Sequence, residues 1–261
     1  MKQAIIYLLV FISTFSTNLF GQEKVMQIKL SQQEKLSVSN CWGNIHIDGS
    51  DSEGLAEVQF TYTDASKKKT ELLVASIQDY VDIQVTSNQI KIESRPPKGF
   101  SSIDMVIKLP KTFFVSILME KGGEIEVDGI EGGLEINSRN GSIKARELSN
   151  YALLHTVNGS ISVAFTAMNS DKASSFVSLN GEVELTLPEG LSRDLRLSSA
   201  KNGYLRSEFA LDTDMRVYDR DVKIRPTMYQ KEAFQVKSRI GKGGTLLHVS
   251  TGNGPIHLLK Y

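Results

Sequence analysis

Apolar and polar residues alternate with a period of two along most of this chain, which is the pattern of β-strands that bury one face. The alternation is clearest in four segments of the second half, each of which opens on a glycine. They read Gly-Ser-Ile-Lys-Ala from residue 141, Gly-Ser-Ile-Ser-Val from 159, Gly-Glu-Val-Glu-Leu from 181 and Gly-Pro-Ile-His-Leu from 254. The pattern predicts an all-β fold made of repeated short strands.

An Asn-Gly pair marks the start of each of these segments and occurs once more between them. The pairs stand at Asn140-Gly141, Asn158-Gly159, Asn180-Gly181, Asn202-Gly203 and Asn253-Gly254. Their asparagines are 18 (158 − 140), 22 (180 − 158) and 22 (202 − 180) residues apart, before a longer step of 51 (253 − 202) that has room for two units and a short insertion. We expect Asn and Gly to supply the positive φ angles of a tight turn at each pair.

Two architectures fit this repeat. In a β-solenoid, or β-helix-like fold, each unit is one coil; in an antiparallel β meander, each Asn-Gly pair is a two-residue hairpin turn. The repeat keeps its phase over three successive units, and Gly-Gly pairs at residues 122, 132 and 243 open strands in the same way. Because stacked coils need a constant phase, the solenoid is favoured.

The N-terminal half also has the strand pattern, although it is less regular. Strands are predicted over residues 24–30, 35–39, 44–48, 56–63, 81–86, 89–93 and 103–109. Between Lys69 and Tyr80 the apolar residues have the spacing of a short helix instead. Residues 95–99 form a predicted turn, and no Ser/Gly/Pro-rich linker divides the chain, so one domain over residues 22–261 is expected.

The first 21 residues have the form of a secretory signal peptide. Lys2 precedes an apolar run from Ala4 to Ile12, which is shorter than the roughly 20 residues of a membrane-spanning helix, and small and polar residues follow. We expect cleavage after Gly21, so that the mature chain starts at Gln22; a membrane anchor is the alternative. No cysteine follows the run that could carry a lipid. The protein is therefore predicted to be exported, to the periplasm or the cell exterior.

Charge and cysteine content exclude several classes of protein. Acidic and basic residues number 30 each, and loss of Lys2 leaves 29 basic against 30 acidic. This balance disfavours nucleic acid as a partner, and the basic run Lys67–Lys69 is explained by a solvated turn. Cys41 is the single cysteine, so no internal disulfide can form, and we expect its thiol to be buried beside Trp42.

The sequence contains no recognisable catalytic or cofactor motif. A Gly-x-Ser-x-Gly elbow, a phosphate-binding loop and a dinucleotide fingerprint are all missing. Acidic residues that alternate with apolar ones suit a solvated strand face better than paired catalytic carboxylates; they are Glu124, Glu126, Glu135, Glu182 and Glu184. A weak cation site at His46, Asp48, Asp51 and Glu53 lacks the ligand order of a calcium loop. We therefore predict no catalytic residues, no cofactor and no metal.

Two Leu-Pro steps connect these units to a known family. Leu109-Pro110-Lys111 and Leu187-Pro188-Glu189 each run into a strand, and Thr/Ser-x-Asn-Gly-x-apolar units accompany them. In these features residues 36–261 resemble the bacterial putative-adhesin family, a domain of unknown function in exported proteins of Bacteroidetes-like organisms. The resemblance implies a β-solenoid and export. It is weakest between Tyr204 and Arg239, where aspartates alternate with basic residues.

The predicted function is that of a non-enzymatic exported module, an adhesin or a structural or binding component of the envelope. The alternative is a β-helix protein that binds or cleaves polysaccharide. Sugar binding usually involves exposed aromatic residues, and Trp42 is the only tryptophan. Tyr204, Tyr218 and Tyr229 cluster where the repeat breaks, and they are the predicted contacts to a partner, an envelope or surface protein or a glycan.

Overall fold

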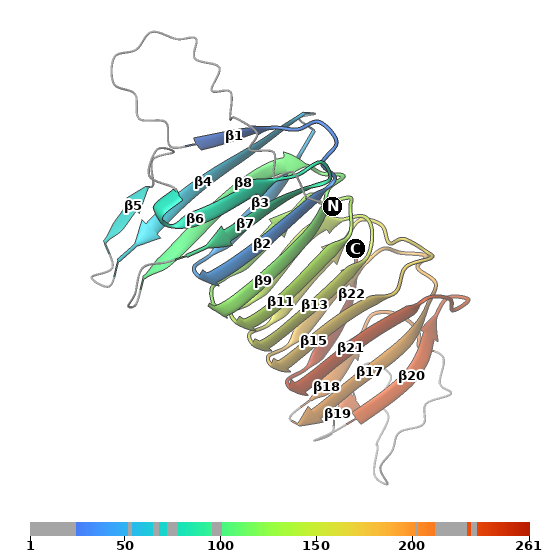
Figure 1. The fold of residues 1–261 in the computed structure, drawn as a ribbon. Coiled ribbons are helices and arrows are strands. Elements are labelled where there is room, and N and C mark those ends of the chain that lie inside the picture. The colour runs from blue at the N-terminus through green and yellow to red at the C-terminus, as the bar shows by residue number, and fades with distance from the viewer. Residues whose placement is uncertain are drawn as a thin grey trace, which may run out of the picture.

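A computed structural model shows two β-sheets that face each other along a stack (Figure 1). It describes residues 25–51, 54–64, 68–71, 78–95, 101–201, 203–211, 229–230 and 234–261. Within these ranges there is no α-helix, so the all-β prediction is confirmed. The described residues accordingly contain no helix able to span a bilayer. The predicted signal peptide, residues 1–21, lies outside the described residues.

The two sheets are called sheet A and sheet B. Sheet A contains twelve strands: β1 (Val25–Lys29), β3 (Ile45–Ser50), β4 (Leu55–Thr63), β5 (Lys69–Glu71), β8 (Ser102–Pro110), β10 (Ile125–Asp128), β12 (Ile143–Leu148), β14 (Ile161–Phe165), β16 (Val183–Leu187), β18 (Tyr204–Ser207), β19 (Tyr229–Gln230) and β22 (Ile256–Lys260). Sheet B contains ten: β2 (Lys35–Trp42), β6 (Val81–Val85), β7 (Gln89–Ser94), β9 (Phe114–Gly122), β11 (Leu134–Asn140), β13 (Ala152–Asn158), β15 (Ser174–Asn180), β17 (Arg193–Lys201), β20 (Phe234–Ile240) and β21 (Leu246–Asn253).

Successive strands alternate between the sheets in the central part of the chain. From β9 to β16 the odd strands lie in sheet B and the even strands in sheet A, and each pairs in parallel with the strand two places along the chain. The Asn-Gly turns therefore lead from one sheet to the other and do not join neighbouring antiparallel strands. The antiparallel meander is wrong for this region.

Two pairs of strands, one near each end of the described chain, are inserted between strands that follow each other in the order of coils. Strands β2 and β3 lie between the pair β7/β8 and the pair β9/β10. Strands β21 and β22 lie likewise between β15/β16 and β17/β18, which places the C-terminus within the length of the stack (Figure 1). Asn253 is thus the neighbour of Asn180, and the long step in the repeat reflects this insertion.

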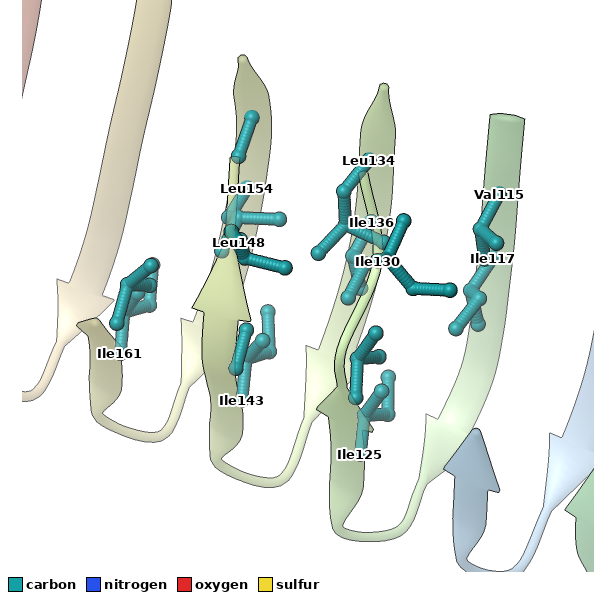
Figure 2. Packing of buried hydrophobic residues seen from close by; sticks show 14 of the residues in the cluster. Val115, Ile117, Ile125, Ile130, Leu134, Ile136, Ile143, Leu148, Leu154 and Ile161 are labelled. Carbon is teal, nitrogen blue, oxygen red and sulfur yellow. The ribbon is translucent and has the colours of Figure 1, made fainter. Parts of the chain in front are cut away.

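The core lies between the two sheets and is made by the inward residue of every second position. Ile125, Ile143, Ile161, Val183 and Ile256 are register partners on consecutive strands of sheet A, and all are at most 1% exposed. Side chains of sheet B meet them from the other side (Figure 2). Burial of such a side chain contributes roughly 1.5–3 kcal/mol, so repetition of the unit supplies the stability of the fold.

Glycine is required at the turns because neighbouring turns approach closely. A Cβ on Gly141 would lie 2.0 Å from the carbonyl oxygen of Gly123, and one on Gly159 would lie 2.2 Å from that of Gly141. Gly141 also has a φ of +113°. Asn140, Asn158, Asn180 and Asn253, in contrast, do not have positive φ, since Glu147 is the only non-glycine residue with positive φ among the described residues; Asn202 lies outside them. The expectation that Asn supplies a positive φ angle is wrong.

Asparagine instead stabilises the turns through its side-chain amide. The Nδ2 of Asn158 donates to the Oδ1 of Asn140 at 2.7 Å, and that of Asn180 donates to the Oδ1 of Asn158 at 2.9 Å. Two residues earlier, a buried hydroxyl donates to a turn carbonyl: Thr156 to Gly141 at 3.1 Å, and Ser178 to Gly159 at 2.7 Å. These bonds satisfy buried polar groups and explain the Thr/Ser-x-Asn-Gly pattern.

The seven strands predicted in the N-terminal half are confirmed, and two other expectations fail. Lys69–Glu71 pairs with the end of β4 as strand β5, so the helix predicted from Lys69 is wrong there; residues 72–77 lie outside the described residues. Cys41 is a free thiol that is half-buried, not buried. Asn40, its neighbour on β2, fills the inward position and donates to the carbonyl oxygens of Gly43 and Ile103, so Cys41 faces outward.

Candidate functional site

The predicted contact residues Tyr204 and Tyr229 lie on adjacent strands. Tyr204 starts β18 and is opposite Gln230, while Tyr229 is opposite Leu205. Tyr218 lies outside the described residues. The structure therefore brings two of the three tyrosine positions together in one part of sheet A. Their role as contacts stays a prediction.

Tyr204 belongs to a row of polar groups that contact one another on the outer face of sheet A. The Nε2 of His257 is 3.2 Å from the Tyr204 hydroxyl oxygen, and its Nδ1 is 3.7 Å from Oε2 of Glu184. The hydroxyl of Ser162 in turn donates to Glu184 at 3.5 Å. An imidazole between a hydroxyl and a carboxylate can transfer protons, so this is the part of the described chain where acid–base chemistry would be possible.

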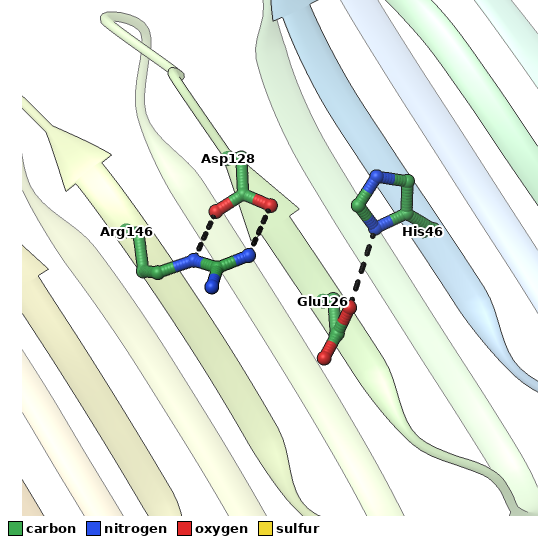
Figure 3. Close-up of polar contacts among 4 residues, drawn as sticks. All are labelled: His46, Glu126, Asp128 and Arg146. Atoms are coloured by element: carbon green, nitrogen blue, oxygen red, sulfur yellow. Dashed lines mark hydrogen bonds and ion pairs between the residues drawn. The ribbon is translucent and has the colours of Figure 1, made fainter.

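Farther along sheet A, acidic and basic side chains form ion pairs between neighbouring strands (Figure 3). Arg146 binds Asp128 with two hydrogen bonds of 2.6 and 2.8 Å, which hold the pKa of the Asp128 carboxyl below its ordinary value. The Nδ1 of His46 lies 3.5 Å from Oε2 of Glu126. These groups are register neighbours on β3, β10 and β12, so their pairing follows from strand alignment.

The residues considered for a cation site do not converge. His46 pairs with Glu126, and Asp51 accepts a 2.7 Å bond from the Lys111 ammonium group. Glu53 lies outside the described residues. Nowhere in the described ranges do three His, Cys, Asp or Glu side chains gather as metal ligands would.

On the outer face of sheet B, three adjacent strands differ from their neighbours in their content of charged residues. Strands β13, β15 and β21 are adjacent, and none of their outward positions carries Asp, Glu, Lys or Arg. We call this surface the uncharged face; its outward residues are Leu153, His155, Val157, Ser175, Val177, Leu179, Leu246, His248, Ser250 and Gly252. Leu153 is 39% exposed and Leu179 is 51% exposed. Two large apolar side chains are thus open to solvent on this face.

Hydrogen bonds between strands hold the polar groups of the uncharged face. The Nδ1 of His248 is 3.1 Å from the Ser175 hydroxyl oxygen, and the hydroxyls of Ser198 and Ser250 are 2.9 Å apart. Burial, and secondarily the charge of Arg196, lowers the pKa of His248 below its ordinary value. This direction favours the uncharged imidazole in the folded protein.

A hollow of about 420 Å³ opens at the edge where the strands of sheet B turn toward sheet A. Trp42 lines it together with Asn44, Lys121, Glu124 and Asn140 and with the glycines at positions 122, 123 and 141. This volume falls at the lower end of the range of small-molecule sites. We call it the Trp42 slot. It brings the single tryptophan together with amide, ammonium and carboxylate groups.

Comparison with known proteins finds similarity among solved structures. No family model matches the chain, and no curated protein is similar to it. Among solved structures it is similar to a putative cell adhesion protein from Clostridium sporogenes, with 14% identity, a TM-score of 0.41 and coverage of 91% of this chain and 99% of the other. A putative adhesin from Bacteroides fragilis has 11% identity, a TM-score of 0.40 and coverage of 90% and 96%.

Sequence reasoning missed both the uncharged face and the Trp42 slot. The signal for the face was present, since the outward positions of three repeat units lack charge, but the neighbour of β15 is β21 and not β17. The signal for the slot was a Gly-Gly pair at residue 122 in place of Asn-Gly. Its meaning depends on the pairing of Gly122 with Trp42, which lies 80 residues earlier (122 − 42).

Proposed function

We propose that this protein is an exported, non-enzymatic binding module, an adhesin or envelope component that presents the uncharged face of a rigid two-sheeted β-solenoid to an uncharged partner surface. The observation that carries the proposal is the contrast between two groups of adjacent strands, one in each sheet. The outward positions of β10 and β12 bear Glu126, Asp128, Lys144 and Arg146, whereas those of β13, β15 and β21 bear no Asp, Glu, Lys or Arg.

A solenoid supports this role because its faces are broad and rigid. In the alternating region the parallel ladders, the amide bonds between asparagines and the buried hydroxyls all fix one coil on the next. A surface that is already ordered loses little conformational entropy when a partner binds. Exposed apolar side chains in such a surface, here Leu153 and Leu179, contribute apolar contact area.

The test is binding of the purified protein to bacterial and host cell surfaces with a single charge placed in the uncharged face. Leu179→Lys adds an ammonium group at an exposed position and should reduce binding at least about tenfold, because desolvation of one unpaired charge opposes contact. The matched control is Ala164→Lys, which adds the same group on the outer face of β14 in sheet A. Equal binding by both variants and the wild type would refute the assignment of this face.

The contacts of His257 with Tyr204 and Glu184 favour polysaccharide cleavage as a second candidate function. Release of oligosaccharides from bacterial or host polysaccharides by the wild type, lost in His257→Gln, would establish it and overturn the non-enzymatic proposal. Replacement of Tyr204, Tyr218 and Tyr229 by serine in the binding assay tests the predicted contacts separately. Unchanged binding would remove these tyrosines from the contact surface.

A further inference from the structure

The Trp42 slot occupies a place where one side chain is missing from a regular column. Along the turn edge of sheet B, asparagines stand one above another; the column contains Asn140, Asn158, Asn180 and Asn253, and Lys201 follows it. On the other side of Asn140 the next position is Gly122, whose Cβ, if present, would lie 3.0 Å from the Asn140 Cβ. Trp42 pairs with Gly122 and comes next. The column thus has a gap of one strand between an amide and an indole.

An irregularity in β9 accompanies the gap. The register of β2 with β9 shifts between Asn40 and Trp42, so β9 uses three steps from Met119 to Gly122 where β2 uses two. Packing requires a glycine at position 123, since a Cβ there would lie 2.0 Å from the carbonyl oxygen of Gly43. Bulges of this kind often redirect side chains at binding sites. Here the result is a slot whose floor is glycine backbone.

The polar groups around the slot retain unused hydrogen-bonding capacity. Oδ1 of Asn44 accepts the backbone N–H of Glu124 at 2.9 Å, and the Nδ2 group of Asn44 makes no hydrogen bond within the described chain. The Lys121 ammonium and Glu124 carboxylate groups likewise make no ion pair among the described residues, and both residues are exposed. The slot therefore combines hydrogen-bond donors from Asn44 and the positively charged Lys121 with the negatively charged acceptor Glu124, next to Trp42.

We infer that the Trp42 slot binds one pyranose ring of an uncharged glycan. This inference rests on the proposed function and specifies the chemistry of the partner. A pyranose has an apolar C–H face that packs on an indole and a rim of hydroxyls that hydrogen-bonds with amide, ammonium and carboxylate groups together. The charges of Lys121 and Glu124 balance, so the slot selects neither an anionic nor a cationic sugar. The same turn edge borders sheet B, so a glycan chain seated in the slot can continue along it.

The experiment uses the fluorescence of Trp42, which is the only tryptophan in the chain. The purified protein is titrated with methyl β-D-glucopyranoside, methyl β-D-galactopyranoside, methyl α-D-mannopyranoside and N-acetylglucosamine, and with sorbitol as an acyclic polyol. We expect a saturable change with at least one pyranoside at about millimolar concentration and none with sorbitol. No saturable change with any pyranoside, or an equal change with sorbitol, would overturn the inference.

Variants are compared by calorimetric titration with the pyranoside that binds best. Trp42→Ala should weaken binding at least about tenfold, whereas Trp42→Phe, which keeps an aromatic face, should remain within about threefold of the wild type. Asn44→Ala alters an exposed side chain, preserves folding and should weaken binding by a few-fold. Asn180→Ala, in the same column but remote from the slot, is the control and should bind as the wild type does. Wild-type affinity in both Trp42→Ala and Asn44→Ala contradicts the inference.

The cell-surface assay separates failure of this inference from failure of the proposed function. If the wild type binds cells and no pyranoside, the module function stands and the slot assignment is wrong. If pyranosides bind in the slot while the protein binds no cell surface, the slot is correct and the proposed function is wrong.

Discussion

The turn glycines allow the cost of close approach to be separated from the cost of an unusual backbone angle. At Gly181 a Cβ would lie 2.2 Å from the carbonyl oxygen of Gly159, although its φ is not positive. Gly190 is the reverse case, since its φ is +74° and no atom lies within 4 Å of the Cβ position. Gly141 combines both features, with a φ of +113° and a contact of 2.0 Å.

Three alanine variants follow from this comparison. Gly190→Ala should cost about 1–2 kcal/mol, the cost of placing a Cβ in the left-handed region. Gly181→Ala should lower the free energy of unfolding by about 1–3 kcal/mol, because the backbone of the neighbouring coil must move. Gly141→Ala carries both costs and should lose about 2–5 kcal/mol.

Equilibrium urea unfolding measures the three free energies under one condition. If neighbouring turns must approach closely, Gly141→Ala is the least stable of these proteins, Gly181→Ala is intermediate and the wild type is the most stable. A Gly181→Ala protein as stable as the wild type would show that neighbouring coils do not need glycine to approach, and would refute the reasoning.

Three further predictions concern stability and export. Thr156→Val should lose about 1 kcal/mol in urea unfolding, because the Gly141 carbonyl oxygen loses a buried donor, while Thr186→Val on the outer face should be nearly neutral; equal effects would contradict this. The lowered pKa of His248 means that the unfolded chain takes up a proton first as pH falls below about 6.5, so stability should decrease from there until the folded group titrates. His248→Gln should remove that part of the decrease, and an unchanged pH profile would count against it. Mass spectrometry of the exported protein should find Gln22 at the N-terminus, whereas an intact Met1 would disprove cleavage.

Local pattern predicted the elements of this fold well, because each strand carries its own alternation and each turn its own glycine. The units after Gly141, Gly159 and Gly181 all formed strands as expected. The order of strands was not accessible in the same way. Nothing within residues 246–253 specifies that β21 pairs with both β15 and β17, since that pairing depends on how distant segments pack.

The candidate sites were hidden for the same physical reason. The Trp42 slot depends on a partner strand and a register shift, and the uncharged face depends on β21 being inserted beside β15. The tyrosines were found by composition, which brought Tyr204 and Tyr229 to attention but could not reveal that His257 lies between Tyr204 and Glu184.

Salt dependence of binding tests the central claim most directly, because the uncharged face and the outer face of β10 and β12 differ in their content of charged residues. Affinity of the purified protein for the cell surface that it binds best would be measured from about 0.05 M to about 0.5 M sodium chloride, a range over which exposed charge pairs become strongly screened. Contact through the uncharged face predicts an affinity that stays within about twofold over this range. A loss of tenfold or more would show that charged residues, such as those on β10 and β12 of sheet A, carry the contact, and would contradict the account.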